Sequence, residues 1–143
     1  MILLDTNVVS EPIRPRPFGR VRAWIDSQPA RSLFLCTPVL AELRYGVERL
    51  PAGSRRERLD RWVHQLESEH FVDRILPVDQ QAAHVFGRIV TRRERSGRPI
   101  KPMDALIASV AINYGLAVAT RDVQDFADLG LELINPFVAS TER

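Results

Sequence analysis

Residues 1–12 read MILLDTNVVSEP, an apolar run that ends abruptly at Asp5 and is followed by two polar residues. A short apolar run bounded by polar residues is typical of a buried strand. A carboxylate directly after such a strand can form an Asx turn, cap a helix, or bind a metal ion at the strand end. One carboxylate fits all three explanations, so the rest of the chain must decide between them.

Four further short apolar runs follow, and long segments with the helical spacing of apolar residues separate the first four runs. This alternation predicts an α/β fold, a parallel sheet with helices on both faces. Gly115 is expected to end the last long helix. The expected strands are residues 2–4, 33–36, 75–78, 117–119 and 131–134, and the helical stripes are Phe18–Ile25, Leu59–Leu66, Val85–Val90 and residues 103–115.

The length of 143 residues fits one domain with a sizeable core. No apolar run approaches the ~20 residues of a membrane span, and no basic segment precedes the first run, so we expect neither a span nor a signal peptide. Cys36, the single cysteine, suits a reducing cytoplasm. Of the 20 basic residues only Lys101 is a lysine. The arginine excess suits phosphate recognition, although a compositional bias of the genome explains it equally well.

Four carboxylates stand where an open α/β sheet gathers its ligands. Asp5 ends the first strand, Asp122 follows the strand AVAT, and Asp104 opens the most apolar helix. Each also has a structural explanation, as a turn, a helix cap or a partner of the helix dipole. Glu42 has no cation three or four residues away, so its charge needs a distant arginine or a metal ion.

Taken together, these four acids indicate a cation site. Carboxylates that pack together raise one another's pKa, and a divalent cation removes that conflict. No histidine or cysteine stands near them in the sequence. Oxygen ligands alone select Mg²⁺ or Mn²⁺ rather than Zn²⁺.

The chain resembles the PIN-domain ribonucleases, specifically the VapC-type toxins of toxin–antitoxin pairs. The opening stretch and the TRD that ends in Asp122 are most similar to the FitB-like branch. The resemblance implies one PIN domain over residues 1–143, with a central parallel five-stranded sheet in the order 3-2-1-4-5 flanked by helices. The matching stretches, in chain order, are LLDTNVVSE, AELRYGV, DALIASVA and ATRDVQDF.

The resemblance further implies an endoribonuclease that uses Mg²⁺ or Mn²⁺ to hydrolyse RNA phosphodiesters in the cytoplasm. A small antitoxin would neutralise it and would carry the pair to operator DNA, and the assembly would be a homodimer or a toxin–antitoxin hetero-oligomer. The residues carried over by position are the catalytic and metal-binding acids Asp5, Glu42, Asp104 and Asp122 and the supporting polar residues Thr6, Asn7 and Thr120.

Other residues receive weaker assignments. Arg88, Arg92 and Arg95 share one helical face and are candidate phosphate contacts, with a solvated helix face as the alternative. The resemblance leaves the role of Arg121 open, and Asp125 is expected to cap a helix or lie on the surface.

The segment SRRERLDRWVHQLESEHF offers more apolar side chains than one core face needs. We expect it to form a hairpin with the Glu42 helix and to leave a groove for the antitoxin. The alternative is that Trp62 lies wholly in the core.

Two other functions fit parts of the sequence. A phosphoryl-aspartate phosphatase needs a second aspartate two residues after the first, where Asn7 stands, and a receiver domain needs paired early acids that the chain lacks. The second alternative is a non-catalytic co-repressor subunit of a toxin–antitoxin DNA-binding complex. That alternative predicts an operator shift by the co-expressed pair without cleavage by this chain alone.

Overall fold

The computed structural model describes residues 1–139 and is built on a five-stranded sheet in the order β3-β2-β1-β4-β5. Every neighbouring pair of strands is parallel, as expected. The central strand β1 is wholly apolar, and its Leu3 and Leu4 are buried, as expected for a parallel strand with both faces covered. The strands are β1 (Ile2–Leu4), β2 (Leu33–Cys36), β3 (Ile75–Leu76), β4 (Ala117–Ala119) and β5 (Leu133–Ile134).

Along the chain, α-helices connect each strand to the next, except between β4 and β5. A π-helical turn, η3 (Leu66–His70), extends the helix before β3, and a 3-10 turn, η4 (Val123–Phe126), stands between β4 and β5. The α-helices are α1 (Thr6–Val9), α2 (Gly19–Ser27), α3 (Thr37–Glu48), α4 (Ser54–Gln65), α5 (Gln80–Arg95) and α6 (Pro102–Tyr114), with the 3-10 turns η1 (Glu11–Ile13) and η2 (Ala30–Ser32).

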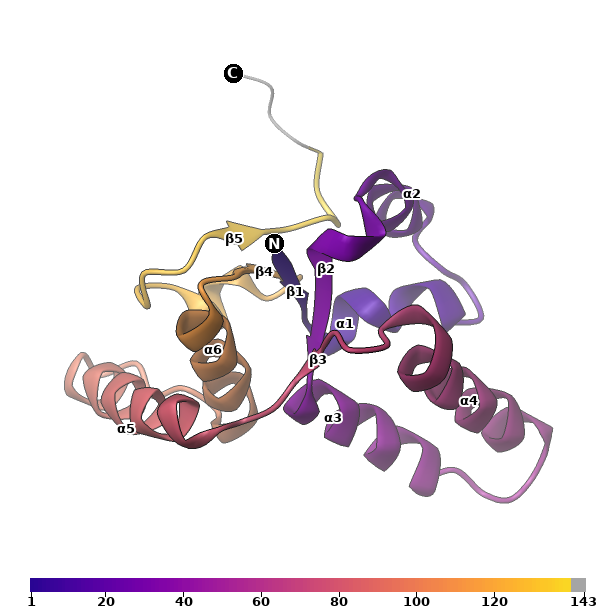
Figure 1. The fold of residues 1–143 in the computed structure, drawn as a ribbon, viewed down its shortest axis with the longest axis horizontal. Coiled ribbons are helices and arrows are strands. Elements are labelled where there is room, and N and C mark those ends of the chain that lie inside the picture. The colour runs from indigo at the N-terminus through magenta and orange to yellow at the C-terminus, as the bar shows by residue number, and fades with distance from the viewer. Residues whose placement is uncertain (140–143) are drawn as a thin grey trace.

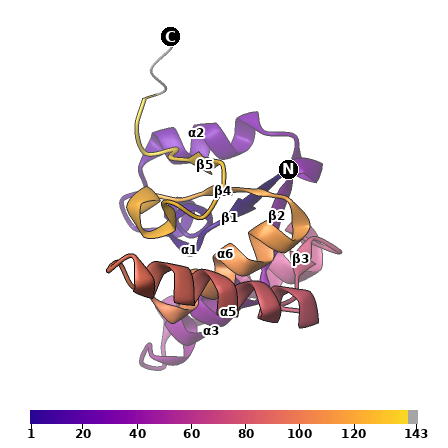
Figure 2. The same ribbon diagram turned by 90° about the vertical axis from the view of Figure 1, so that its left-hand side faces the viewer.

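The helices lie on both sides of the central strands. Figure 1 shows α5 and α6 on one side of β1 and β2, with α1, α2 and α4 on the other. Figure 2 shows α5 and α6 running beside each other in the turned view, and these two helices share the most extensive contact in the fold. Leu3, Leu35 and Val118 are fully buried in the strands between these layers. Each such side chain contributes roughly 1.5–3 kcal/mol by burial.

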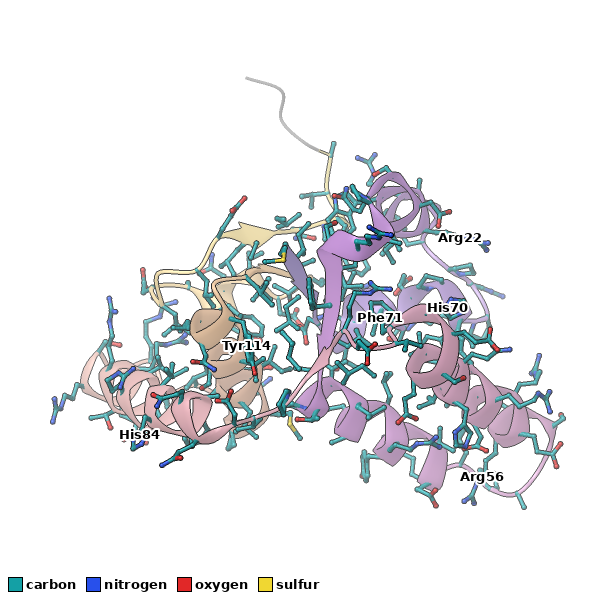
Figure 3. All side chains as sticks on the ribbon, viewed as in Figure 1. Arg22, Arg56, His70, Phe71, His84 and Tyr114 are labelled. Carbon is teal, nitrogen blue, oxygen red and sulfur yellow. The ribbon has the colours of Figure 1, made fainter. Side chains whose placement is uncertain are left out.

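The helices α3 and α4 form the expected hairpin, which projects from the carboxyl end of β2 (Figure 1). Arg44 on α3 pairs with Asp60 on α4 at 2.5 Å. At the loop that joins the two helices, where Figure 3 labels Arg56, this residue donates to Glu48 at 2.9 Å. These ion pairs join the two helices, and Val63 on α4 is fully buried.

Three expectations about element limits are wrong. The fifth strand begins at Leu133 rather than at residue 131. The third strand ends at Leu76 rather than residue 78, because the N–H of Val78 donates to Thr37 Oγ1 instead of a neighbouring strand. Phe18 lies outside the helical stripe expected to begin there. It precedes the first residue of α2, is 48% exposed, and stacks on Phe137 with ring centroids 6.2 Å apart.

The end of α6 is as expected, since Gly115 has the left-handed φ of 68° that favours glycine. Its N–H donates to the carbonyls of Ala111 and Ile112, which satisfies groups at the helix end. The chain can therefore reverse directly into β4.

Candidate active site

The carboxyl ends of β1, β2 and β4 meet at one edge of the sheet and bring the predicted acids together. The N–H of Asp5 donates to the carbonyl of Ala119 at 2.9 Å, which continues the pairing of β1 with β4. Glu42 stands in the second turn of α3, which begins directly after β2. Asp104 lies in the first turn of α6, and Asp122 follows β4.

Asp5 is the hydrogen-bonding centre of this site and is only 5% exposed. Its Oδ1 accepts from the N–H of Thr6 at 2.8 Å, so Asp5 also caps α1. Its Oδ2 accepts from Thr120 Oγ1 at 2.7 Å and from Asn7 Nδ2 at 3.3 Å. The cap and the site are therefore compatible explanations of the same carboxylate.

Each supporting polar residue links Asp5 to another acid. Thr6 Oγ1 donates to Glu42 Oε1 at 2.8 Å. Asn7 Nδ2 donates to Asp122 Oδ2 at 3.1 Å as well as to Asp5. Thr120 Oγ1 donates to Asp5 and accepts from the N–H of Asp122 at 3.0 Å.

These contacts decide two of the structural alternatives. The Asp122 side chain makes no capping hydrogen bond to η4, so it is not held there as a helix cap. Within residues 1–139 Glu42 has no ion pair, so no arginine of that part of the chain neutralises it. The hydrogen bonds that these two carboxylates do accept come from Thr6 and Asn7, the polar residues of the shared site.

Burial and mutual repulsion favour the protonated form of three of the acids. Burial is the main cause that raises the pKa of Asp5 and of Glu42. The pKa of Asp104 rises to about 6, first because of burial and then because of the charges of Asp5, Asp125 and Asp122. The acids are therefore close enough to oppose one another's ionisation.

The donor chemistry of the site fits a hard divalent cation. Within residues 1–139, no three acidic, histidine or cysteine side chains already stand in an arrangement that encloses a metal ion. Asp5, Glu42, Asp104 and Asp122 nevertheless offer only carboxylate oxygens, and the raised pKa values of Asp5, Glu42 and Asp104 show a conflict that a cation relieves. The four acids thus gather at one end of the sheet without enclosing a cation-sized site in residues 1–139.

The predicted arginines lie apart from the acids. Arg88, Arg92 and Arg95 line one exposed hollow of about 460 Å³ on α5, which confirms that they share a face. Arg121 has a different position: its guanidinium lies 4.0 Å from the Phe137 ring and 3.5 Å from Glu11 Oε2.

Sequence reasoning missed two buried charged residues near the site. Glu11 is 3% exposed and accepts from the N–H of Phe18 at 3.0 Å. Arg93 is buried and donates to the carbonyls of Arg98 at 2.7 Å and Asp125 at 2.9 Å. Arg93 therefore ties η4, which follows Asp122, to α5.

Asp125 lies in the first turn of η4, and its charge raises the pKa of Asp104. It is thus nearer the site than a plain surface position would suggest.

No helix in the described part of the chain is long and apolar enough to cross a membrane.

Comparisons with known proteins match this chain over nearly its whole length. A family model described as PIN domain matches residues 2–131. VapC ribonuclease Y4jK of Sinorhizobium fredii is 39% identical over 140 residues, which are 96% of this chain and 98% of that protein. Toxin FitB of Neisseria gonorrhoeae is 39% identical over 137 residues, covering 96% and 99%.

The same similarity extends to a solved structure, that of FitAB bound to an IR36 DNA fragment. The matching chain in that structure superposes with a TM-score of 0.93 at 36% identity, and the match covers 100% of both chains.

Proposed function

The chain belongs to the PIN-domain family, and from that premise we propose that it is a VapC-type ribonuclease, the toxin of a toxin–antitoxin pair, which hydrolyses RNA phosphodiesters with Mg²⁺ or Mn²⁺. The observation that carries the proposal is the convergence of Asp5, Glu42, Asp104 and Asp122 at the carboxyl end of the sheet. Relatives named ribonuclease and toxin, similar over nearly their full length, support it.

In this mechanism the acids hold the cation and the polar residues hold the acids. Asp5, Glu42 and Asp104 would bind the cation directly or through water, and Asp122 would bind a second ion or orient the attacking water. When bound, the cation lowers the pKa of a water molecule and offsets negative charge on the phosphate. Cleavage of this kind leaves a 5′ phosphate and a 3′ hydroxyl.

The supporting residues keep the carboxylates in place before the cation arrives. Thr120 and Asn7 each hold Asp5 relative to Asp122, and Thr6 does the same for Glu42. Because these hydrogen bonds already order the side chains, less conformational entropy is lost when cation and substrate bind. Such orienting partners of metal ligands typically affect metal affinity or activity ~10–100-fold.

The partner in this proposal is a small antitoxin that neutralises the nuclease in the cytoplasm and contacts operator DNA. The similar structure of FitAB bound to a DNA fragment supports a paired, DNA-binding assembly. RNA would be drawn to the nuclease by positive charge, for which the face of Arg88, Arg92 and Arg95 is one candidate.

A non-catalytic co-repressor remains the second candidate, since a toxin-like subunit can serve a DNA-binding complex without cutting RNA. Operator shift by the co-expressed pair, with no cleavage by this chain alone, would favour that function. Retention of the complete set of four acids favours the nuclease.

The test is cleavage of a single-stranded RNA by the purified chain with Mg²⁺, with chelator, and after Mg²⁺ is restored. Wild type should cleave, stop with chelator, and recover. Glu42→Gln should be inactive, whereas Asp26→Asn, at an exposed acid on α2, should behave as wild type. Cleavage in excess chelator, or full activity of Glu42→Gln, would overturn the metal-dependent assignment.

A further inference from the structure

A groove of about 550 Å³ is lined by α1 and the turn η1 on the one hand and by the α3–α4 hairpin on the other. Thr6 and Glu42 lie at one end of it, and these two residues are joined by the 2.8 Å hydrogen bond of the acidic site. The groove thus opens directly onto the candidate active site. Its apolar wall consists of Ile13, Leu43, Leu50, Leu59 and Trp62.

Exposed arginines surround this groove. Arg14 has a 3.6 Å ion pair with the buried Glu11, and Arg49 lies over the Tyr45 ring at 5.8 Å. Arg55 and Arg58 make no ion pair with any residue in the range 1–139. Against these four arginines the groove holds one acid, Glu42, so its charge is positive beside a negative site.

We propose that this groove binds the single-stranded RNA that flanks the scissile phosphate, with phosphates on the arginines and bases against the apolar wall. The inference rests on the proposed ribonuclease function and names the surface that delivers its substrate. The acids repel a phosphate chain, so a positive surface continuous with them is needed to bring RNA into reach. The Thr6–Glu42 end of the groove provides that continuity.

The shape and composition of the groove favour a single strand over a duplex. Its volume lies in the ~300–1,000 Å³ range of small-ligand pockets, which admits unstacked nucleotides but not a double helix. Half-buried Trp62 supplies an aromatic surface in the wall. Basic edges combined with an aromatic or apolar wall are how proteins hold single-stranded nucleic acids.

The alternative occupant is a segment of the antitoxin, for which the sequence predicts a groove beside this hairpin. Trp62 also borders a second hollow of about 550 Å³, which is lined by apolar residues including Ile25, Leu66 and Phe71. His70 and Phe71 on its α4 side and Arg22 on its α2 side are visible in Figure 3. That hollow has none of the four acids in its lining, whereas the arginine-edged groove has Glu42.

The test measures RNA binding in an Asp104→Asn background, where the RNA should remain intact. Fluorescence anisotropy of a labelled single-stranded oligoribonucleotide is followed over a salt series. The groove variant is Arg55→Gln with Arg58→Gln. The control removes the same charge from exposed arginines outside the groove, Arg20→Gln with Arg61→Gln.

The groove variant should weaken binding and lower the steepness of log K against log salt by about 1.4, since each phosphate contact on a single strand contributes about 0.7. The control should keep the slope of its parent. Equal losses in the two double variants, or an unchanged slope in the groove variant, would overturn the proposal. Unchanged RNA binding with lost affinity for the antitoxin would also overturn it, in favour of a protein occupant.

A cleavage assay separates failure of this inference from failure of the proposed function. With Asp104 intact, the groove variant should cleave with a raised KM and a kcat near that of wild type. If wild type cleaves and the groove variant has the same KM, the groove inference alone fails. If wild type does not cleave any RNA with Mg²⁺ or Mn²⁺, the proposed function fails and the groove inference with it.

Discussion

Burial and the charges of neighbouring acids raise the pKa of Asp104 to about 6. Within residues 1–139 its side chain accepts no hydrogen bond and forms no ion pair. Asp5, by contrast, accepts hydrogen bonds at both carboxylate oxygens. Asp104 is therefore the acid whose charge can be removed with the least damage to the fold.

The first prediction concerns Asp104→Asn. It should lower the cleavage rate by more than about 100-fold. The substitution removes one of the negative charges that bind the cation, and a bound cation stabilises the transition state by several kcal/mol. Without metal, its melting temperature should equal or exceed that of wild type, because one repulsive charge is gone. Mg²⁺ should raise the melting temperature of wild type and do so much less for the variant. A variant that unfolds far more easily without metal would instead make Asp104 a structural residue.

The second prediction is a pH dependence with a definite sign. The pKa of Asp104 is about 6 in the folded protein and 3.8 ordinarily, so folding favours its protonated form. Its contribution to metal-free stability is fully present below 3.8 and is lost as pH rises through about 6. Stabilisation by Mg²⁺ should therefore be small near about pH 5 and larger near about pH 7.5, since binding must displace the proton.

Denaturant unfolding at several pH values, with and without Mg²⁺, measures this dependence. Asp104→Asn should flatten the metal-free profile across the same range. A wild-type protein whose metal-free stability rises from about pH 5 to 7.5 by as much as that of the variant would contradict the assignment.

At the scale of elements, apolar periodicity predicts which segments become strands and helices, but not where they stop. The third strand is shorter than expected because Thr37, a residue from another element, takes the N–H of Val78. Arg93 occupies the same buried stripe of α5 as Val85 and Ile89, so its helical spacing could have marked it. Its carbonyl partner at Asp125 comes from a distant segment and could not have been foreseen.

The third prediction uses two glycines of these elements. Gly115→Ala should destabilise the protein by roughly 1–2 kcal/mol, because Gly115 has φ of 68° and an L-residue is strained there. Gly87→Ala, inside α5 with no atom within 4 Å of an added Cβ, should stabilise it by roughly 0.5–1 kcal/mol. Urea unfolding of both variants measures the difference, and an equal effect of the two changes would contradict the account of the α6 end.

At the scale of the whole molecule, topology assembles the site from distant residues. With β1 between β2 and β4, the carboxyl ends of three strands deliver Asp5, the start of α3 and Thr120 to one place. The sequence indicated the four acids and the three polar residues by type and by resemblance. It could not show that Asn7 and Thr120 each join Asp5 to Asp122, because those contacts depend on side-chain geometry across 115 residues of chain.

The ion pair of the buried Glu11 with Arg121 was the part least open to prediction. Glu11 and Arg121 are far apart in the sequence, and each looks like an ordinary surface residue there. Only the fold places the Arg121 guanidinium between Glu11 and the Phe137 ring. Arg121, whose role the sequence left open, joins the turn η1 to the segment that follows β4 through its ion pair with Glu11.

The most direct test of the central claim is sequencing of RNA 5′ ends after brief expression of this chain without a partner, beside the same experiment with Asp104→Asn. The account predicts new 5′-phosphate ends at discrete positions with wild type, and none with the variant at equal protein level. The same new ends in both samples, or none with wild type, would contradict an RNA-cleaving site built on these acids.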